Sequence, residues 1–240
     1  MNKSKGTALV TGGAIRIGRS IAVRLSELGF HIALHYRTSD TEARKTAEII
    51  KKNKVRCQLF SCDLSDADDT FALMGRVKQW SSGLNLLINS SSVFERSSLR
   101  DWQPDHYERQ WNINFKSAFI LTSEFAKHCK KGQVVNILDT NIVKDKTSHF
   151  IYLLTKKSLF EFTKMAAVEL APNIRVNAVA PGPILPPLGE SPAYLKKRAQ
   201  NVPLREIGNP SQIADCVAFL VNSPYITGQV IFNDGGEHLN

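Results

Sequence analysis

A tyrosine and a lysine four residues apart, Tyr152 and Lys156, are the pair in this sequence best suited to chemistry. On a helix this spacing places both side chains on one face, one turn apart. A phenol can donate a proton, and a neighbouring ammonium is expected to lower the pKa of that phenol because positive charge favours phenolate. The alternative is a core tyrosine and a solvated lysine on an ordinary amphipathic helix, and the rest of the chain must decide between them.

A third candidate group, Asp139, stands thirteen residues before Tyr152. It directly follows the apolar run 134–138, which predicts a buried strand. In an open parallel sheet, ligands bind beyond the carboxyl ends of the strands. We therefore expect Asp139, Tyr152 and Lys156 to converge on one crevice.

A glycine-rich turn, 11–18, lies between a predicted first strand at 7–10 and a predicted helix at 19–28. Glycine lets backbone N–H groups approach a pyrophosphate at the start of the helix, where the helix dipole favours negative charge. A glycine turn alone is weak evidence. Its place between a first strand and a first helix, with a second strand at 30–36, predicts a dinucleotide site.

The residues after this second strand bear on which dinucleotide is bound. An NAD site usually carries an acidic residue about 20 positions past the glycine turn, on the ribose 2′-hydroxyl. This chain has Arg37, Thr38 and Ser39 there, and a guanidinium with two hydroxyls suits a 2′-phosphate. Arg16 in the glycine turn is consistent with the same choice. We therefore predict NADPH in preference to NADH, although Arg37 taken alone is also compatible with a surface arginine.

Three further strand ends and helices carry polar candidates. Asp63 follows the predicted strand 55–60 and suits either the adenine amino group or the cap of a helix starting near residue 65. The small residues 89–92 follow the strand 84–88, and Phe94 just beyond them would lie over the crevice. Asn114 lies inside a predicted helix at 103–129, where asparagine is unfavourable unless its amide has a task.

Seven predicted strands alternate with helices, without a linker or repeat. This pattern predicts an α/β fold: one doubly wound (Rossmann) domain over residues 1–240, with a seven-stranded parallel sheet and helices on both faces. Within it, the segment 183–205 is rich in proline and charge, has no strong period, and is predicted to be a mobile substrate-binding lid. The predicted strands are 7–10, 30–36, 55–60, 84–88, 134–138, 174–179 and 229–232.

Composition excludes several classes of protein. The 240 residues are 42% apolar and 22% charged, which is ordinary for a globular domain, and no run of about 18 apolar residues predicts a membrane span. The first strand begins too early to leave room for a signal peptide, and the four cysteines show no CxxC spacing. We therefore expect a cytoplasmic protein, and the scattered histidines predict no metal site.

The formal net charge of +9 admits three readings: a nucleic-acid surface, attraction of anionic small ligands, or a solvated face of little meaning. Nucleic-acid binding calls for a concentrated basic patch, whereas the lysines here are dispersed. A field that attracts a phosphate-bearing cofactor and an acidic substrate fits better.

Over essentially its whole length the chain resembles the short-chain dehydrogenase/reductases. The matching motifs are Thr11-Gly12 and Gly18, Asp63, Asn89, Asn114, Tyr152 with Lys156, Asn177 to Gly182, and Asp234-Gly235-Gly236. Three motifs depart from the common pattern: Arg16 replaces the middle glycine, Ser90 to Ser92 replace an Asn-Ala-Gly run, and Asp139 replaces the usual serine. These departures resemble one branch, the pteridine reductases and the related bacterial dihydromonapterin and dihydrofolate reductases.

The resemblance implies an NADPH-dependent reduction of a pterin ring, with the proton supplied by Tyr152. It implies that Asn114 holds a water linked to Lys156, that the pterin stacks on Phe94 beside Ser92, and that the protein is a homotetramer. The rival of the same fold is a 3-oxoacyl-(acyl-carrier-protein) reductase or another carbonyl reductase; a regulator that only senses NADPH, or a purely structural role, is a more distant alternative. The predicted cofactor contacts are Gly12, Arg16, Ile17, Gly18, His35, Tyr36, Arg37, Thr38, Ser39, Asp63, Leu64, Asn89, Ser90, Ser91, Tyr152, Lys156, Pro181, Gly182 and Ile184.

Overall fold

The computed structural model describes residues 4–81, 83–187, 189 and 191–240. Residues 1–3 of the predicted domain and residues 188 and 190 of the predicted lid lie outside the described residues.

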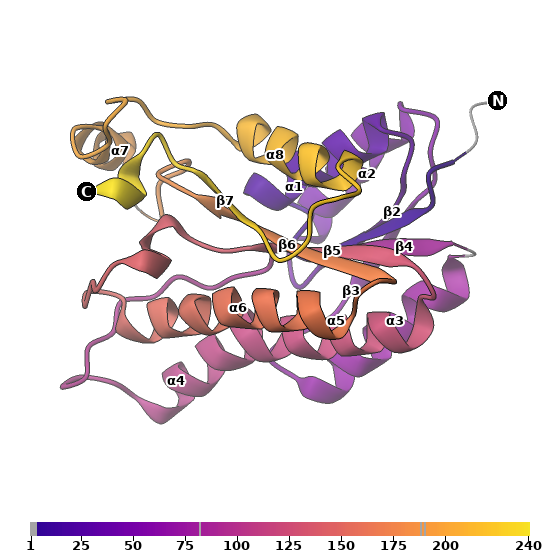
Figure 1. Cartoon of the computed structure of the whole chain (residues 1–240), viewed down its shortest axis with the longest axis horizontal. Helices are drawn as coiled ribbons and strands as arrows, with labels where there is room; N and C mark the ends of the chain where they lie inside the picture. The colour runs from indigo at the N-terminus through magenta and orange to yellow at the C-terminus, as the bar shows by residue number, and fades with distance from the viewer. Residues whose placement is uncertain (1–3, 82, 188, 190) are drawn as a thin grey trace.

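One parallel sheet forms the centre of the molecule (Figure 1). Within the described residues it has seven strands in the spatial order β3-β2-β1-β4-β5-β6-β7, and each neighbouring pair is parallel. The order of connection reverses between β1 and β4, which places a ligand crevice at the carboxyl ends of these strands. The strands are β1 Thr7–Val10, β2 His31–Tyr36, β3 Cys57–Ser61, β4 Leu84–Asn89, β5 Gly132–Ile137, β6 Ile174–Pro181 and β7 Val230–Asn233.

Helices cover both faces of this sheet (Figure 1). On one face α1 (Arg16–Glu27), α2 (Asp40–Lys51) and α8 (Pro210–Asn222) pack on a shared apolar cluster, and on the other α3 (Ala67–Trp80), α5 (Ser117–His128) and α6 (Phe150–Glu169) pack on a second one. Strands buried on both faces read as continuous apolar runs, which is why they were visible in the sequence. The predicted doubly wound fold is confirmed.

Two predicted segments differ in detail. The helix predicted at 103–129 is divided into α4 (Pro104–Trp111), a π-helical turn η1 (Asn112–Lys116) and α5. The segment 183–205, predicted to be a lid without a strong period, contains α7 (Pro192–Ala199). Eight residues are too few for a helical period to emerge from a sequence rich in charge. Short 3₁₀ turns, η2 (Thr140–Val143) and η3 (Glu237–Leu239), also escaped prediction.

Three observations on the described residues bear on the expectations from composition. No helix among them combines the length and the apolar character needed to cross a bilayer. All four cysteines are unpaired thiols. In the same part of the chain, no group of three or more His, Cys, Asp or Glu side chains is arranged to hold a metal ion.

Candidate active site

The glycine-rich turn between β1 and α1 is shaped by glycine and held by a histidine. Gly12 has a φ of +62°, in the region that favours glycine, and a Cβ on Gly18 would collide with the Gly12 carbonyl. The Gly12 N–H donates to Nδ1 of His35 at 3.0 Å, while Nε2 of that ring lies 3.1 Å from the Cys62 carbonyl oxygen. Nδ1 must therefore be unprotonated and Nε2 carries the proton. Burial lowers the pKa of His35 to about 4, so the ring stays neutral.

The residues predicted to select NADPH over NADH lie at the end of β2. The Arg37 guanidinium is 4.0 Å from the Asp63 carboxylate, and both side chains are about half exposed. Asp63 also accepts hydrogen bonds from the N–H and hydroxyl of Ser65, whereas the cap of α3 is Asp66. Of the two roles considered for Asp63, the helix cap is therefore wrong. Its carboxylate borders the cavity beside Arg37.

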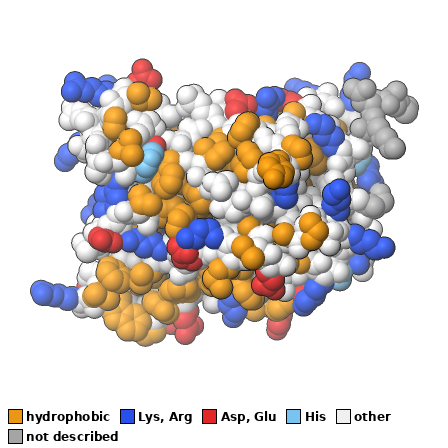
Figure 2. All heavy atoms as spheres, viewed as in Figure 1, with side chains coloured by type: hydrophobic (Ala, Val, Ile, Leu, Met, Phe, Trp, Pro, Cys, Tyr) orange, Lys and Arg blue, Asp and Glu red, His pale blue; other side chains and the backbone are white. Residues whose placement is uncertain are grey.

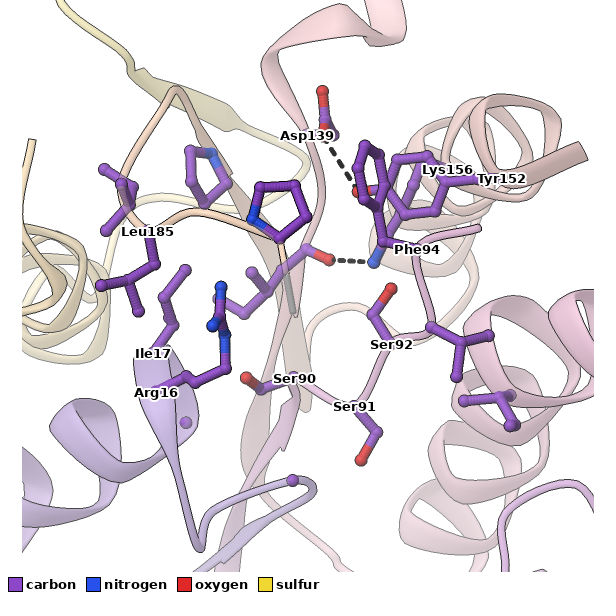
Figure 3. A pocket seen from close by; sticks show the side chains of 18 of the residues that line it. Arg16, Ile17, Ser90, Ser91, Ser92, Phe94, Asp139, Tyr152, Lys156 and Leu185 are labelled. Carbon is purple, nitrogen blue, oxygen red and sulfur yellow. Dashed lines mark hydrogen bonds between the residues drawn. The ribbon is translucent and has the colours of Figure 1, made fainter. Parts of the chain in front are cut away.

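Arg16 reaches across the crevice. Its backbone φ is +54°, a conformation that residues other than glycine rarely adopt. Its guanidinium donates to the Pro186 carbonyl at 2.7 Å, in the loop that follows β6. Figure 3 shows it near Ile17 and Leu185 at the edge of the cavity. Arg16, which in the sequence is consistent with NADPH, borders the cavity but is held by the loop after β6.

Asp139, Tyr152 and Lys156 converge as predicted (Figure 3). The Tyr152 hydroxyl donates to Asp139 Oδ2 at 2.9 Å, and the Lys156 ammonium donates to the Ile137 carbonyl at 2.9 Å. The other carboxylate oxygen of Asp139 accepts from the backbone N–H and side-chain amide of Asn141, both at 2.7 Å. Strand β5 and η2 therefore fix the carboxylate, and α6 supplies the phenol and the ammonium.

The electrostatics of the tyrosine correct one expectation. The pKa of Tyr152 is raised well above its usual value, first because the phenol is buried and then because the Asp139 carboxylate lies beside it. The expected lowering by Lys156 is therefore wrong for this arrangement, in which the ammonium is 5.8 Å from the centre of the tyrosine ring. Burial lowers the pKa of Lys156 to about 8, against an opposing contribution from Asp139.

Two asparagines predicted at the site are buried in the framework around it. Asn114, in η1, pairs with the N–H and carbonyl of Val93 at 2.8 and 3.0 Å, and its amide donates to the Thr155 hydroxyl at 3.2 Å. It thus ties the loop after β4 to the residue next to Lys156. Asn89, a predicted cofactor contact, does not border the cavity. Its amide instead donates to Asn136 at 2.8 Å, because the side chain of this last β4 residue faces the protein interior.

Phe94 presents an aromatic face at the cavity, with 41% of its surface exposed. Its ring stacks on that of His149 at a centroid distance of 4.0 Å and an interplanar angle of 13°, and it meets Tyr152 edge-on at 4.7 Å. His149, Lys146, Tyr194 and Arg198 also border the cavity but were not singled out from sequence. Their spacing follows no motif, and α7, which carries two of them, was not predicted.

The cavity has a volume of about 770 Å³ and runs along the carboxyl ends of the strands. That size lies in the upper range of small-molecule and cofactor sites. The predicted residues that border it are Gly12, Arg16, Ile17, Gly18, His35, Tyr36, Arg37, Thr38, Ser39, Asp63, Leu64, Ser90, Ser91, Ser92, Phe94, Asp139, Tyr152, Lys156, Pro181, Gly182 and Ile184.

Comparison with known proteins places this arrangement in a family. The family model described as enoyl-(acyl carrier protein) reductase matches residues 13–238. The chain belongs to the short-chain dehydrogenase/reductase family. In this member of the family the tyrosine hydroxyl donates to an aspartate, Asp139.

Individual relatives within the short-chain dehydrogenase/reductase family differ in their named activities. A 3-oxoacyl-[acyl-carrier-protein] reductase from Staphylococcus aureus is 30% identical over 97% of this chain and 98% of its own. An NADPH-dependent aldehyde reductase 1 of Arabidopsis thaliana is 31% identical over 100% of this chain and 88% of its own. Among solved structures, the FolM alternative dihydrofolate reductase 1 from Brucella suis in complex with NADP is 31% identical, with a TM-score of 0.93 over 98% of this chain and 96% of that one.

Proposed function

We propose that this chain is an NADPH-dependent reductase of a pterin ring, which takes a dihydropterin, dihydromonapterin or dihydrofolate to the tetrahydro form. The observation that carries the proposal is the carboxylate of Asp139 at 2.9 Å from the Tyr152 hydroxyl. An ionised carboxylate can only accept hydrogen bonds, which disfavours a ketone oxygen beside it. A pterin instead offers ring N–H and amino groups. The likeness to the Brucella dihydrofolate reductase supports this substrate class.

The residues at the crevice fit NADPH. The narrow turn at Gly12 and Gly18, which a Cβ would obstruct, allows backbone N–H groups to meet a pyrophosphate. Arg37 with Thr38 and Ser39 would hold the 2′-phosphate. When bound, NADPH supplies the hydride. The Brucella suis structure, which is a complex with NADP, supports the same cofactor here.

The chain itself supplies the proton and the orientation. The raised pKa keeps Tyr152 protonated, and its phenol is the group that we assign as the acid that protonates a ring nitrogen. Asp139 orients the phenol by accepting its hydrogen bond. Lys156 would bind the nicotinamide ribose hydroxyls. Phe94 gives the flat ring a stacking surface worth about 0.5–1.5 kcal/mol beyond burial of area.

A panel of substrates tests the proposal. Purified protein should oxidise NADPH in the presence of dihydrobiopterin, dihydromonapterin or dihydrofolate, and should use NADH less well. Turnover of a β-ketoacyl thioester with no turnover of any of the three pterins would contradict it.

The second candidate is a 3-oxoacyl-(acyl-carrier-protein) reductase. The similarity to the Staphylococcus aureus enzyme over nearly the whole length favours it, and a basic chain would suit an acidic carrier protein. The aspartate in place of a hydroxyl donor and the exposed ring of Phe94 weigh against it. The same panel separates the two candidates.

A further inference from the structure

Two cations at the substrate end of the cavity have no part in the mechanism above. Lys146 lies in the loop between η2 and α6, and Arg198 lies on α7; both border the cavity. Both contact a single carboxylate oxygen, Oε1 of Glu237, Arg198 through a hydrogen bond and Lys146 at 3.8 Å. Two segments far apart in the sequence thus bring their positive groups to one place.

Positive charge exceeds negative charge at this place. The Glu237 side chain is only 3% exposed, and the Lys144 ammonium donates to the backbone carbonyl of the same residue. One buried glutamate is therefore contacted by three cations. Burial lowers the pKa of Lys146, the charges of Arg198 and Lys144 act in the same direction, and the carboxylates of Glu237 and Asp139 act against them. An anion between Lys146 and Arg198 would relieve this repulsion.

The positive charge of this group also acts near Phe94, where the pterin ring is predicted to stack. His149, which stacks on Phe94, has a lowered pKa, first because it is buried and then because Arg96 and Arg198 are near. Asp139 acts on His149 in the opposite direction. The positive groups are thus close enough to act on His149, which packs against the aromatic ring of Phe94.

Both cations retain hydrogen-bonding capacity. A guanidinium has five N–H donors, and among the described residues the structure records one hydrogen bond from the Arg198 side chain, to Glu237. For the Lys146 ammonium, in the same part of the chain, it records the 3.8 Å contact and no hydrogen bond. Arginine and lysine side by side suit a carboxylate, which can accept from both. Glu237 holds them without neutralising both.

We propose that Lys146 and Arg198 bind a carboxylate of the substrate, so that a pterin with an acidic tail, as in dihydrofolate, is preferred to a tail-free pterin. This inference rests on the proposed pterin reduction. It assigns the specificity for the tail to α7 and the loop before α6, apart from the groups that act on the ring.

Steady-state kinetics with dihydrofolate and dihydrobiopterin test this inference. The variants Lys146→Met and Arg198→Met should each raise KM for dihydrofolate about tenfold, the size of one lost charged hydrogen bond, and leave kcat nearly unchanged. KM for dihydrobiopterin, which has no carboxylate, should change less than twofold. Arg198→Lys should recover part of the loss. Lys197→Met, on the exposed face of the same helix, is the matched control and should behave as wild type.

The outcomes separate the two levels of the argument. If the wild type turns over neither pterin, the proposed function fails and this inference falls with it. If both pterins are turned over but the variants impair them equally, or impair neither, pterin reduction stands and the carboxylate site alone is wrong. Lys146→Met is the second variant because Lys146 contacts Glu237 only at 3.8 Å. Its replacement should therefore disturb the fold less than the replacement of Arg198, whose hydrogen bond to Glu237 is lost in Arg198→Met.

Discussion

At the scale of single residues, the decisive pair is a phenol that gives its hydrogen bond to a carboxylate. Desolvation and the charge of Asp139 both favour the protonated form of Tyr152. In this arrangement the phenol therefore keeps its proton, as the role of acid that we propose for Tyr152 requires. The sequence predicted that these residues meet, but not the direction of the pKa, because spacing does not reveal which charge lies closer to the hydroxyl.

Replacement of Tyr152 by phenylalanine removes the proton and keeps the ring. We expect Tyr152→Phe to lower kcat about 10²- to 10⁴-fold, the range of a lost general acid, while NADPH binding stays nearly intact. Stopped assays of turnover would measure kcat, and a fluorescence titration would measure the binding of NADPH. Full activity in this variant would show that the proton comes from another group.

At the scale of elements, the strands and the long helices follow from apolar runs, while the pieces that shape the substrate site do not. The π-helical turn that holds Asn114 interrupts a continuous helical pattern, and α7 is short and charged. His149 becomes a neighbour of Phe94 only once the loop after β4 and the start of α6 are placed side by side. Asn89 was assigned to the cofactor because its strand ends at the crevice, yet its side chain faces the interior.

The hydrogen bond from the Gly12 N–H in the glycine turn to His35 on β2 predicts that the stability of the fold depends on pH. His35 has a pKa of about 4 in the folded chain and about 6.5 when unfolded, so its contribution is complete above pH 6.5 and is lost as pH falls toward 4. Between pH 7 and pH 5 this should cost about 2 kcal/mol of the free energy of unfolding. Urea unfolding of wild type and His35→Asn at both pH values would measure it.

Comparing wild type with His35→Asn separates the contribution of His35 to the pH dependence from that of the other titrating groups. His35→Asn should be less stable than wild type at pH 7, and the difference should shrink at pH 5. An unchanged difference across these pH values would show that the ring is not held neutral by its contacts with Gly12 and Cys62.

At the scale of the whole molecule, apolar side chains remain exposed on the helices below the sheet. Phe119 on α5 is 50% exposed, and Met165 and Val168 on α6 are 70% and 82% exposed. Phe119 packs beside Phe162 with centroids 5.5 Å apart, which extends the apolar surface from one helix to the next. Figure 2 shows further orange side chains along the lower left edge, where Figure 1 places α4. Such a surface is typical of an interface between copies of a chain.

We expect a homotetramer, as the resemblance of the sequence to its family implied. Light scattering coupled to size exclusion should give a mass near four times that of one 26.7-kDa chain. Val168→Glu should shift the protein to smaller species, because a charge would be buried without a partner. The same change at the exposed Tyr225, on another part of the surface, serves as a comparison. A wild-type monomer at micromolar concentration would contradict the prediction.

The last residues of the chain reach back to the site. Asp234 accepts hydrogen bonds from the Thr140 hydroxyl and the Gly236 N–H, and Glu237 contacts Arg198 and the Lys144 side chain. A purification tag fused after Asn240 would therefore follow directly on the segment that contacts η2 and α7. A tag at the other end precedes the amino end of β1, opposite the crevice, and is the sound choice for preparing active enzyme.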